Sequence, residues 1–326
     1  MIAFVIRRLL QAVLVLLAVA LLSFAIFRYV GDPIANMVGQ DTSVADREKL
    51  RQDLGLNDSA VVQFVRFVAD AAQGEFGMSY RIGRPVGELI AERLPATLEL
   101  SLAAALFSIA IGIPMGVYTG LYPRRWLSKA FLTLSLVGIS LPTFLIGIIL
   151  ILVFGVQLGL LPTNGRGDVV QLGWWSTGLL TESGLRSLVM PAVTLGLFQL
   201  TLIMRLVRAE MLEVLRADYI KFARARGLAN RAVHFGHALK NTLVPVITIT
   251  GLQVGSIVAF AIVTETVFQW PGMGLLLIQA IQFVDIPVMA SYLMLVSLLF
   301  VLINLTVDLL YYVVDPRLRV EARAAR

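Results

Sequence analysis

Long apolar stretches alternate with shorter polar ones along most of this chain of 326 residues. A helix of about 20 apolar residues, rising about 1.5 Å per residue, crosses the hydrocarbon core of a membrane. Six stretches are long enough, and they predict six transmembrane helices, the first within residues 1–30 and the others at about 96–120, 130–155, 187–208, 241–265 and 286–312. Residues 266–284 are also apolar, but Trp270-Pro271-Gly272-Met273-Gly274 interrupts them, which predicts a loop or a short re-entrant hairpin.

The segment between the first two predicted helices, residues 31–95, is polar and does not cross the membrane. Part of it predicts an amphipathic helix on the outer surface, because apolar residues recur there at helical spacing: Val61, Phe64, Val65, Val68 and Ala72. Residues 57–59 offer side chains that can cap this helix. Two roles stay open for it, a docking surface for another protein or packing against the chain's own transmembrane helices.

Small and kinking residues mark where the predicted helices pack closely or bend. Gly112, Gly116 and Gly120 follow one another at four-residue steps, which lets another helix approach. Pro114 predicts a kink in the second helix, and Pro142 predicts a bend in the third.

Four residues are candidates for lining or gating a pathway through the membrane: Pro114, Gly138, Pro142 and Glu265. Glu265 is predicted at the outer end of the fifth helix, and acidic residues near the bilayer are functional candidates by default. A cationic or zwitterionic substrate would need such an acidic partner. Ordinary membrane packing explains the prolines and the glycine equally well.

The distribution of positive charge predicts which side of the membrane each polar segment faces. Of the 27 Lys and Arg residues, the segments on the N-terminal side hold 17, and the short outer loops hold two. The other eight lie in or beside residues 31–95, and such a long segment counts little towards orientation. Both termini and residues 209–240 are therefore predicted to be cytoplasmic.

Composition excludes several classes of protein. With 58% hydrophobic and 15% charged residues, the chain reads as an all-α membrane protein, not a soluble globule. The net charge of +6 flanks the apolar stretches and does not predict binding to nucleic acid. There is no cysteine and no P-loop motif, neither histidine lies at membrane depth beside Ser140, and His234 and His237 lack a zinc-binding pattern. No catalytic, cofactor or metal site is expected.

The stretch from Arg205 to Pro245 is basic and does not span the membrane, and it holds eight of the Lys and Arg residues and both histidines. Asp218 is a candidate N-cap for a helix over 219–226, which Gly227 would end in the left-handed conformation. Asn230 is a candidate cap for a second helix to about Lys240. The predicted apolar face of the first helix consists of Tyr219, Ile220 and Ala223. Either a cytosolic protein or anionic lipid could bind this pair of helices.

Three parts of this stretch carry a resemblance to a known motif: the run from Asp218 to Gly227 (DYIKFARARG), HALKN at 237–241, and Pro245. Together they resemble the EAA loop of bacterial ABC importer permeases. More narrowly, the chain resembles the B-type subunit of the dipeptide/oligopeptide/nickel permease family. The resemblance extends nearly end to end, through GDP at 31–33, GEFGMS at 74–79, RLPAT at 93–97, WPGMG at 270–274 and DPRLR at 315–319.

The resemblance implies a type I ABC importer transmembrane fold with a core over residues 96–314 and a cytoplasmic tail over 315–326. It also implies that residues 209–240 are a coupling loop that sits in a groove of a cytosolic ATPase. The candidate coupling residues are Asp218, Tyr219, Lys221, Ala223, Arg224, Ala225, Arg226, Gly227 and His237. Ala223 and Gly227 match the second alanine and the glycine of the motif, whereas Lys221 stands where the motif has glutamate.

The implied partners are a second, homologous permease subunit, two ATPase subunits, a solute-binding protein and membrane lipid. ATP and Mg²⁺ would bind to the partner subunits in a multi-pass complex of the bacterial inner membrane. The chain would form half of a translocation pathway that works by alternating access, most simply for di- or oligopeptides. Nickel, glutathione or another small solute is an alternative cargo.

A secondary transporter or channel without ATPase partners is an alternative from another class. It predicts inverted internal repeats and ionisable residues near mid-membrane, and the sequence shows neither. A membrane scaffold that transports nothing is a third possibility, which co-purification of ATPase subunits would distinguish.

Overall fold

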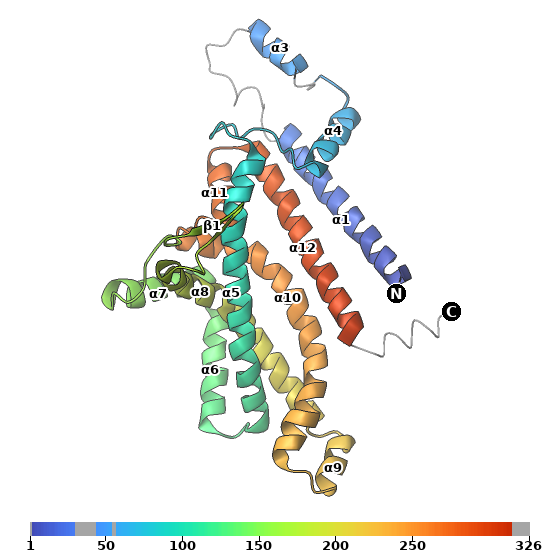
Figure 1. Ribbon diagram of the computed structural model, residues 1–326, viewed down its shortest axis with the longest axis vertical. Coiled ribbons are helices and arrows are strands. Elements are labelled where there is room, and N and C mark those ends of the chain that lie inside the picture. Colours follow the sequence, from blue (N-terminus) through green and yellow to red (C-terminus); the bar gives the residue numbers. More distant parts are fainter. Residues whose placement is uncertain (1, 30–43, 54–56, 315–326) are drawn as a thin grey trace. The chain divides into compact units, whose positions relative to one another are not determined.

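The chain is largely helical and divides into two compact units (Figure 1). The computed structural model describes residues 2–29, 44–53 and 57–314. One unit comprises Met1–Thr97, Val170–Thr177 and Pro271–Val301, and the other comprises Leu98–Val169, Gly178–Trp270 and Leu302–Arg326. The motifs at residues 31–33 and 315–319 and the predicted tail lie outside the described residues.

The first unit is built from helices and a small hairpin, namely α1 (Ile2–Tyr29), α3 (Val44–Asp53), α4 (Ala60–Ala72), the start of α5 (Val86–Leu121), β1 (Val170–Leu172), β2 (Trp175–Thr177), α11 (Met273–Gln282) and the start of α12 (Ile286–Val314). The antiparallel hairpin pairs Val170 with Thr177 and turns at Gly173, whose φ of 67° favours glycine. This hairpin is a local departure from the predicted all-α fold.

Helix α4 is the predicted amphipathic helix. Ser59 caps it by accepting a hydrogen bond from the backbone N–H of Val62. Its rings pack on α1, because Phe24 lies 5.6 Å from Phe64 and 6.1 Å from Phe67 between ring centroids. Of the two roles left open by the sequence, packing against the chain's own first helix is therefore observed, while Val61 stays exposed.

The second unit holds the remainder of α5 and α12 together with α6 (Trp126–Ser140), α7 (Thr143–Leu150), the π-helix η1 (Ile151–Gln157), α8 (Glu182–Val214), α9 (Asp218–Ala225), the π-helix η2 (Ala232–Ala238) and α10 (Leu239–Val267). Its helices α5 and α8 pack along the glycine stripe. A Cβ added to Gly116 would lie 2.5 Å from the Cβ of Val207, and one added to Gly120 would lie 2.7 Å from the Cβ of Met211. The prediction that these glycines admit another helix is confirmed.

The described residues contain four helices that are long and apolar enough to cross a membrane, at Ile6–Ile26, Val86–Leu121, Glu182–Val214 and Ile286–Val307. Two bent pairs raise the number to six if each pair is one span: Trp126–Ser140 with Thr143–Gln157, and Pro245–Gly251 with Gly255–Val267. The first pair turns by 110° at Pro142, as the proline predicted. Helix α11, with ten residues, is too short to span, in agreement with the interruption by WPGMG.

Helix α5 differs from its prediction at its start. It begins at Val86 instead of Ala96 and continues through Pro95 and Pro114 as one helix of 36 residues. Arg84, just before the helix, binds Glu88 and Glu92 on its first turns, at 3.2 and 2.6 Å. Charged residues therefore line the start of a helix whose later turns are apolar.

Candidate functional site

The basic stretch of the sequence forms a compact segment of α9 and η2, here called the α9–η2 segment (residues 218–238), next to the start of α10 (Figure 1). The predicted second helix does not stop near Lys240. Asn230 is already helical, and the helix continues from η2 into α10 as far as Val267. Asn230 is therefore not a cap, and the segment is joined directly to a candidate membrane span.

The predicted cap at Asp218 is also wrong. Ala217 has the extended backbone of the capping position, and Asp218 is the first residue of α9. The Asp218 carboxylate instead accepts a hydrogen bond of 2.8 Å from Lys221 Nζ, three residues later. This hydrogen bond holds the pKa of Asp218 below its ordinary value. Lys221, which replaces the glutamate of the motif, thus has an acidic neighbour in its own helix.

Helix α9 ends as predicted, with Gly227 in the left-handed conformation. Gly227 has a φ of 77°, its N–H bonds to the carbonyl of Arg224, and the N–H of Leu228 bonds to the carbonyl of Ala223. These two bonds form a Schellman motif, which satisfies the last carbonyls of a helix. No atom lies within 4 Å of the position that a Gly227 Cβ would occupy, so the backbone conformation is what requires glycine here.

Helix α9 divides its apolar residues between two faces. Ile220 and Ala223, three residues apart, are buried in a cluster with Val117, Ile203, Val207, Met211, Val233, Ala238 and Val246. Tyr219 and Phe222, also three residues apart, are exposed on the other side, Phe222 at 64%. The predicted single face of Tyr219, Ile220 and Ala223 is therefore wrong for Tyr219, because neighbouring residues on a helix point about 100° apart.

The α9–η2 segment carries further exposed side chains besides Phe222 and Tyr219. Arg226 lies over the Phe222 ring, 5.9 Å from its centroid, within range of a cation–π interaction. Other exposed residues of the segment are Lys221, Arg224, Ala225, Leu228, Phe235 and His237. The segment therefore exposes basic and aromatic side chains, and the opposite side of α9 is buried in the unit. His234, which is only partly exposed, has a pKa lowered by burial and by the charge of Arg224.

The four pathway candidates are not brought together. Pro114 and Pro142 are exposed. Gly138 faces α8, where its Cβ would lie 2.9 Å from Thr201 Oγ1. Glu265 is completely buried, and its carbonyl accepts a hydrogen bond from Trp270 N–H.

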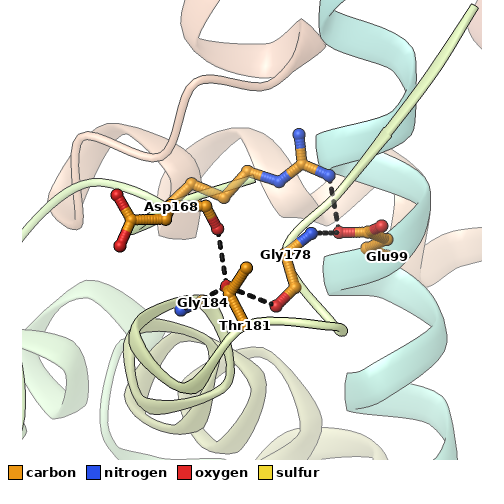
Figure 2. A network of polar contacts seen from close by, with 6 residues as sticks. Glu99, Asp168, Gly178, Thr181 and Gly184 are labelled. Atoms are coloured by element: carbon orange, nitrogen blue, oxygen red, sulfur yellow. Dashed lines mark hydrogen bonds and ion pairs between the residues drawn. The ribbon is translucent and has the colours of Figure 1, made fainter. Parts of the chain in front are cut away.

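A buried polar network in the same unit was missed in the sequence (Figure 2). Arg166 donates a hydrogen bond of 2.6 Å to Glu99 Oε2 on α5, and the Gly178 N–H donates to the same oxygen at 3.3 Å. Thr181, the N-cap of α8, accepts from the Gly184 N–H, and its hydroxyl can donate to the carbonyl of Asp168 or of Gly178. The signal in the sequence was an acid directly before one uncharged stretch, Glu99 before residues 100–123, and a base directly after another, Arg166 after residues 130–165.

A second missed contact lies in the first unit. Asp285, which is buried, accepts hydrogen bonds from Ser79 Oγ and from the Tyr80 N–H. Burial and the charge of Asp285 raise the pKa of Tyr80 to about 12. The contact joins the GEFGMS motif at 74–79 to the turn before α12. Within the described ranges there is no group of three or more His, Asp or Glu residues that could hold a metal ion.

Known proteins match this chain over nearly its whole length. The dipeptide transport system permease protein DppB of Alkalihalophilus pseudofirmus is 37% identical, with 98% of this chain and 100% of the relative covered. The glutathione transport system permease protein GsiC of Escherichia coli K12 is 36% identical, with 98% and 99% covered. A putative peptide transport system permease protein of Brucella abortus is 37% identical over the same shares.

The fold has a solved counterpart in a chain of the MetNI methionine ABC transporter in an inward-facing form. That chain has a TM-score of 0.54 and 19% identity, with 70% of this chain and 96% of the other covered, which supports the predicted type I importer fold. Residues 112–320 match the family described as the binding-protein-dependent transport system inner membrane component, and residues 1–102 match its N-terminal region. The chain belongs to this family of inner membrane transport components.

Proposed function

We propose that this chain forms half of the membrane pathway of an ATP-driven peptide importer, and that an ATPase subunit drives it through the α9–η2 segment. Family membership confirms the resemblance seen in the sequence: the chain is a permease subunit of an ABC importer, a multi-pass inner membrane protein and not an enzyme. The family works with ATPase subunits and with a substrate-binding protein. Transport, not catalysis, is therefore its activity.

Di- or oligopeptides are the proposed substrate class. The support comes from the relatives, whose names give dipeptides, peptides and glutathione, itself a small peptide, as cargo. Each of these relatives is matched over at least 98% of its own length and of this chain. Peptide import explains all three names with one class of substrate.

The observation that carries the coupling role is the division of α9 into a buried and an exposed face. Ile220 and Ala223 anchor the helix in the unit, so a force applied to α9 is passed to the packed helices behind it. Phe222 and Tyr219 present aromatic rings outward, where aromatic anchors with an arginine rim are typical of protein interfaces. Since η2 runs on into α10 without a break, displacement of the segment also displaces a candidate span.

The proposed assembly contains a second permease subunit and two ATPase subunits. Nucleotide-driven closure of the ATPases would move the α9–η2 segments of both permeases and switch the pathway from inward-open to outward-open. This proposal requires the segment and both termini to be cytoplasmic, which agrees with the excess of Lys and Arg in the segments predicted to be inside.

The coupling role is tested by replacing both exposed rings, Tyr219→Ser with Phe222→Ser, in the complete importer. ATPase subunits should no longer co-purify with the permease, and uptake should stop, while membrane insertion stays normal. The matched control is Trp126→Ser, which removes an exposed aromatic ring outside the segment, at the predicted cytoplasmic α5–α6 link. Co-purification of the ATPase at the level of the unaltered protein would refute the coupling role and favour contact with lipid.

The substrate class is tested separately by uptake in a deletion strain. The strain should lose import of a set of di- to oligopeptides and regain it with this permease. Loss of nickel uptake alone would refute the peptide assignment, and loss of glutathione alone would narrow it to that one peptide.

A further inference from the structure

Helix α4 has more apolar surface than its contact with α1 covers. The rings of Phe64 and Phe67 are partly buried against Phe24 of α1. Four other apolar residues on one side of the helix are exposed and are here called the apolar flank: Val61, Val65, Ala69 and Ala72. Val61 and Val65 expose 72% and 60% of their surface. Within the described part of the chain, nothing buries this flank.

The polar residues of α4 lie on the opposite side of its contact with α1. A helix turns by about 100° per residue, so the apolar flank lies about 60–140° from Phe64 around the helix axis. The three polar residues of the helix lie about 100–160° from Phe64 in the other direction: Gln63, Arg66 and Asp70. One side of α4 is therefore suited to hydrocarbon and the other side to water.

The contact with α1 fixes the depth of α4 in the membrane. The apolar stretch Ile6–Ile26 of α1 has 21 residues. Its length is about 31 Å at about 1.5 Å per residue, which matches a hydrocarbon core of about 30 Å. The end of this stretch therefore marks the edge of the hydrocarbon. Phe24 lies about 3 Å before that edge, and the Phe64 ring lies 5.6 Å from the Phe24 ring.

This depth limits what can cover the apolar flank. Figure 1 shows α4 crossing α1 near the end of α1. A helix at this level touches the boundary between the acyl chains and the headgroups, where amphipathic helices bury their apolar face by about 5–10 Å. A soluble protein, such as the substrate-binding protein of the family, meets water-facing surface and not side chains at this depth.

Lipid also fits the flank better than another membrane protein does. Leu21 and Leu22 are exposed on α1 beside the buried Phe24, so apolar surface continues from α4 onto the membrane-spanning helix. Lipid tails are as apolar as leucine, and contacts between helices inside a membrane therefore gain nothing from hiding such residues. An apolar surface at this level needs no protein partner to be stable.

We propose that α4 is an interfacial helix that binds the phospholipid bilayer. Its apolar flank lies among the acyl chains at the end of α1, and its polar side faces water. The helix thereby attaches the polar segment between α1 and α5 to the membrane surface at a second place besides α1 itself. This role goes beyond peptide import and depends neither on the substrate nor on the ATPase.

The test places nitroxide spin labels on α4 in the complete importer, in vesicles of phosphatidylethanolamine and phosphatidylglycerol. The chain contains no cysteine, so Val61→Cys and Val65→Cys each introduce its single thiol, after thiols of the other subunits have been replaced. Oxygen concentrates in lipid, whereas a nickel chelate stays in water. Power-saturation EPR should therefore show both labels to be severalfold more accessible to oxygen than to the nickel chelate.

The matched control is Arg66→Cys, at the position directly after Val65. Arg66 is exposed as well but lies on the polar side of the helix. Its label should show the opposite preference, for the nickel chelate over oxygen.

Two results would overturn the proposal. Access of the nickel chelate to Val61→Cys and Val65→Cys at the level of Arg66→Cys would show that the flank faces water. Protection of both labels from oxygen and from the nickel chelate would show a protein neighbour, such as the second permease subunit.

A second measurement does not depend on the label at Val65. In the Val61→Cys chain, Val65→Asp adds a charge to the apolar flank and should drive the helix out of the lipid, since buried charge is costly there. Oxygen access at position 61 should fall and nickel access should rise, whereas Arg66→Gln should leave both unchanged. Equal access in the presence and absence of Val65→Asp would contradict the contact with lipid.

Discussion

The guanidinium of Arg166 donates a hydrogen bond of 2.6 Å to the carboxylate of Glu99, and the two side chains are only 6% and 4% exposed. The pair joins α5 to a loop 67 residues further along the chain. The Gly178 N–H shares the same carboxylate oxygen, so Glu99 holds two parts of this loop at once (Figure 2).

Removing the charge of Glu99 should therefore destabilise the protein. Glu99→Gln leaves the buried Arg166 without its carboxylate, and breaking one side of a buried ion pair costs about 3–5 kcal/mol. We expect a large fall in the unfolding temperature of the purified protein. The double variant Glu99→Met with Arg166→Met should be less damaging than Glu99→Gln, because no charge is left buried.

The control for this prediction is an ion pair of the same length at the surface. Arg84 and Glu92 are also 2.6 Å apart, but both are about half exposed, and such pairs contribute little. Glu92→Gln should leave the unfolding temperature nearly unchanged. Similar losses from Glu92→Gln and Glu99→Gln would mean that burial does not give the inner pair its importance.

The glycine stripe predicts a different kind of sensitivity. Gly116→Ala would place a methyl group 2.5 Å from Val207 Cβ and 2.7 Å from the carbonyl oxygen of Met204, so α5 and α8 must separate. Overpacking of this kind costs about 1–3 kcal/mol. Thermal unfolding should report the loss, whereas Gly236→Ala, at a glycine with no atom within 4 Å, should report none. An unchanged unfolding temperature for Gly116→Ala would argue against this close packing.

Local features of the fold were predictable from sequence because they depend on residue type and spacing. The stripe of Gly112, Gly116 and Gly120 predicted a close helix contact, and Gly227 predicted a left-handed helix end. Both follow from the lack of a side chain. Pro142 predicted a bend for an equally local reason.

Features that depend on distant or competing partners were not predictable. Asp218 was predicted to cap α9, but the helix begins at Asp218 itself and its carboxylate binds Lys221. Glu99 and Arg166 are 67 residues apart in the sequence, and only the fold brings them together. The face of α9 was misassigned at Tyr219, because apolar character alone does not distinguish an anchoring residue from an outward ring.

Acid should weaken the α9–η2 segment through His234. Burial, and after it the charge of Arg224, lowers the pKa of His234 below 6.5, so the folded state prefers neutral imidazole. The unfolded chain takes up a proton first as the pH falls. Neutral His234 therefore makes its full contribution to the stability of the folded state above about pH 6.5. This contribution is lost as the pH falls towards the lower pKa that His234 has in the folded state.

The measurement is the pH dependence of His234 modification by diethyl pyrocarbonate, followed by mass spectrometry. Its inflection should lie below 6.5, and Arg224→Gln should move it upward by removing the nearby charge. In His234→Gln the acid-induced loss of stability should be smaller. An inflection that does not respond to Arg224→Gln would show that this charge does not act on His234.

In the α9–η2 segment, Gly227 is the position where the effect of backbone conformation can be tested apart from that of side-chain contacts. Its φ of 77° strains any β-branched residue, and free space around it means that no clash adds to this strain. Gly227→Val should cost about 1–3 kcal/mol locally, undo the end of α9 and displace Phe222 and Arg226. Uptake or assembly with the ATPase should then be lost while membrane insertion persists. Gly227→Asn adds a side chain that tolerates this conformation and should keep most activity. Uptake and ATPase co-purification that are unchanged in Gly227→Val would show that the end of α9 does not have to hold this shape for coupling.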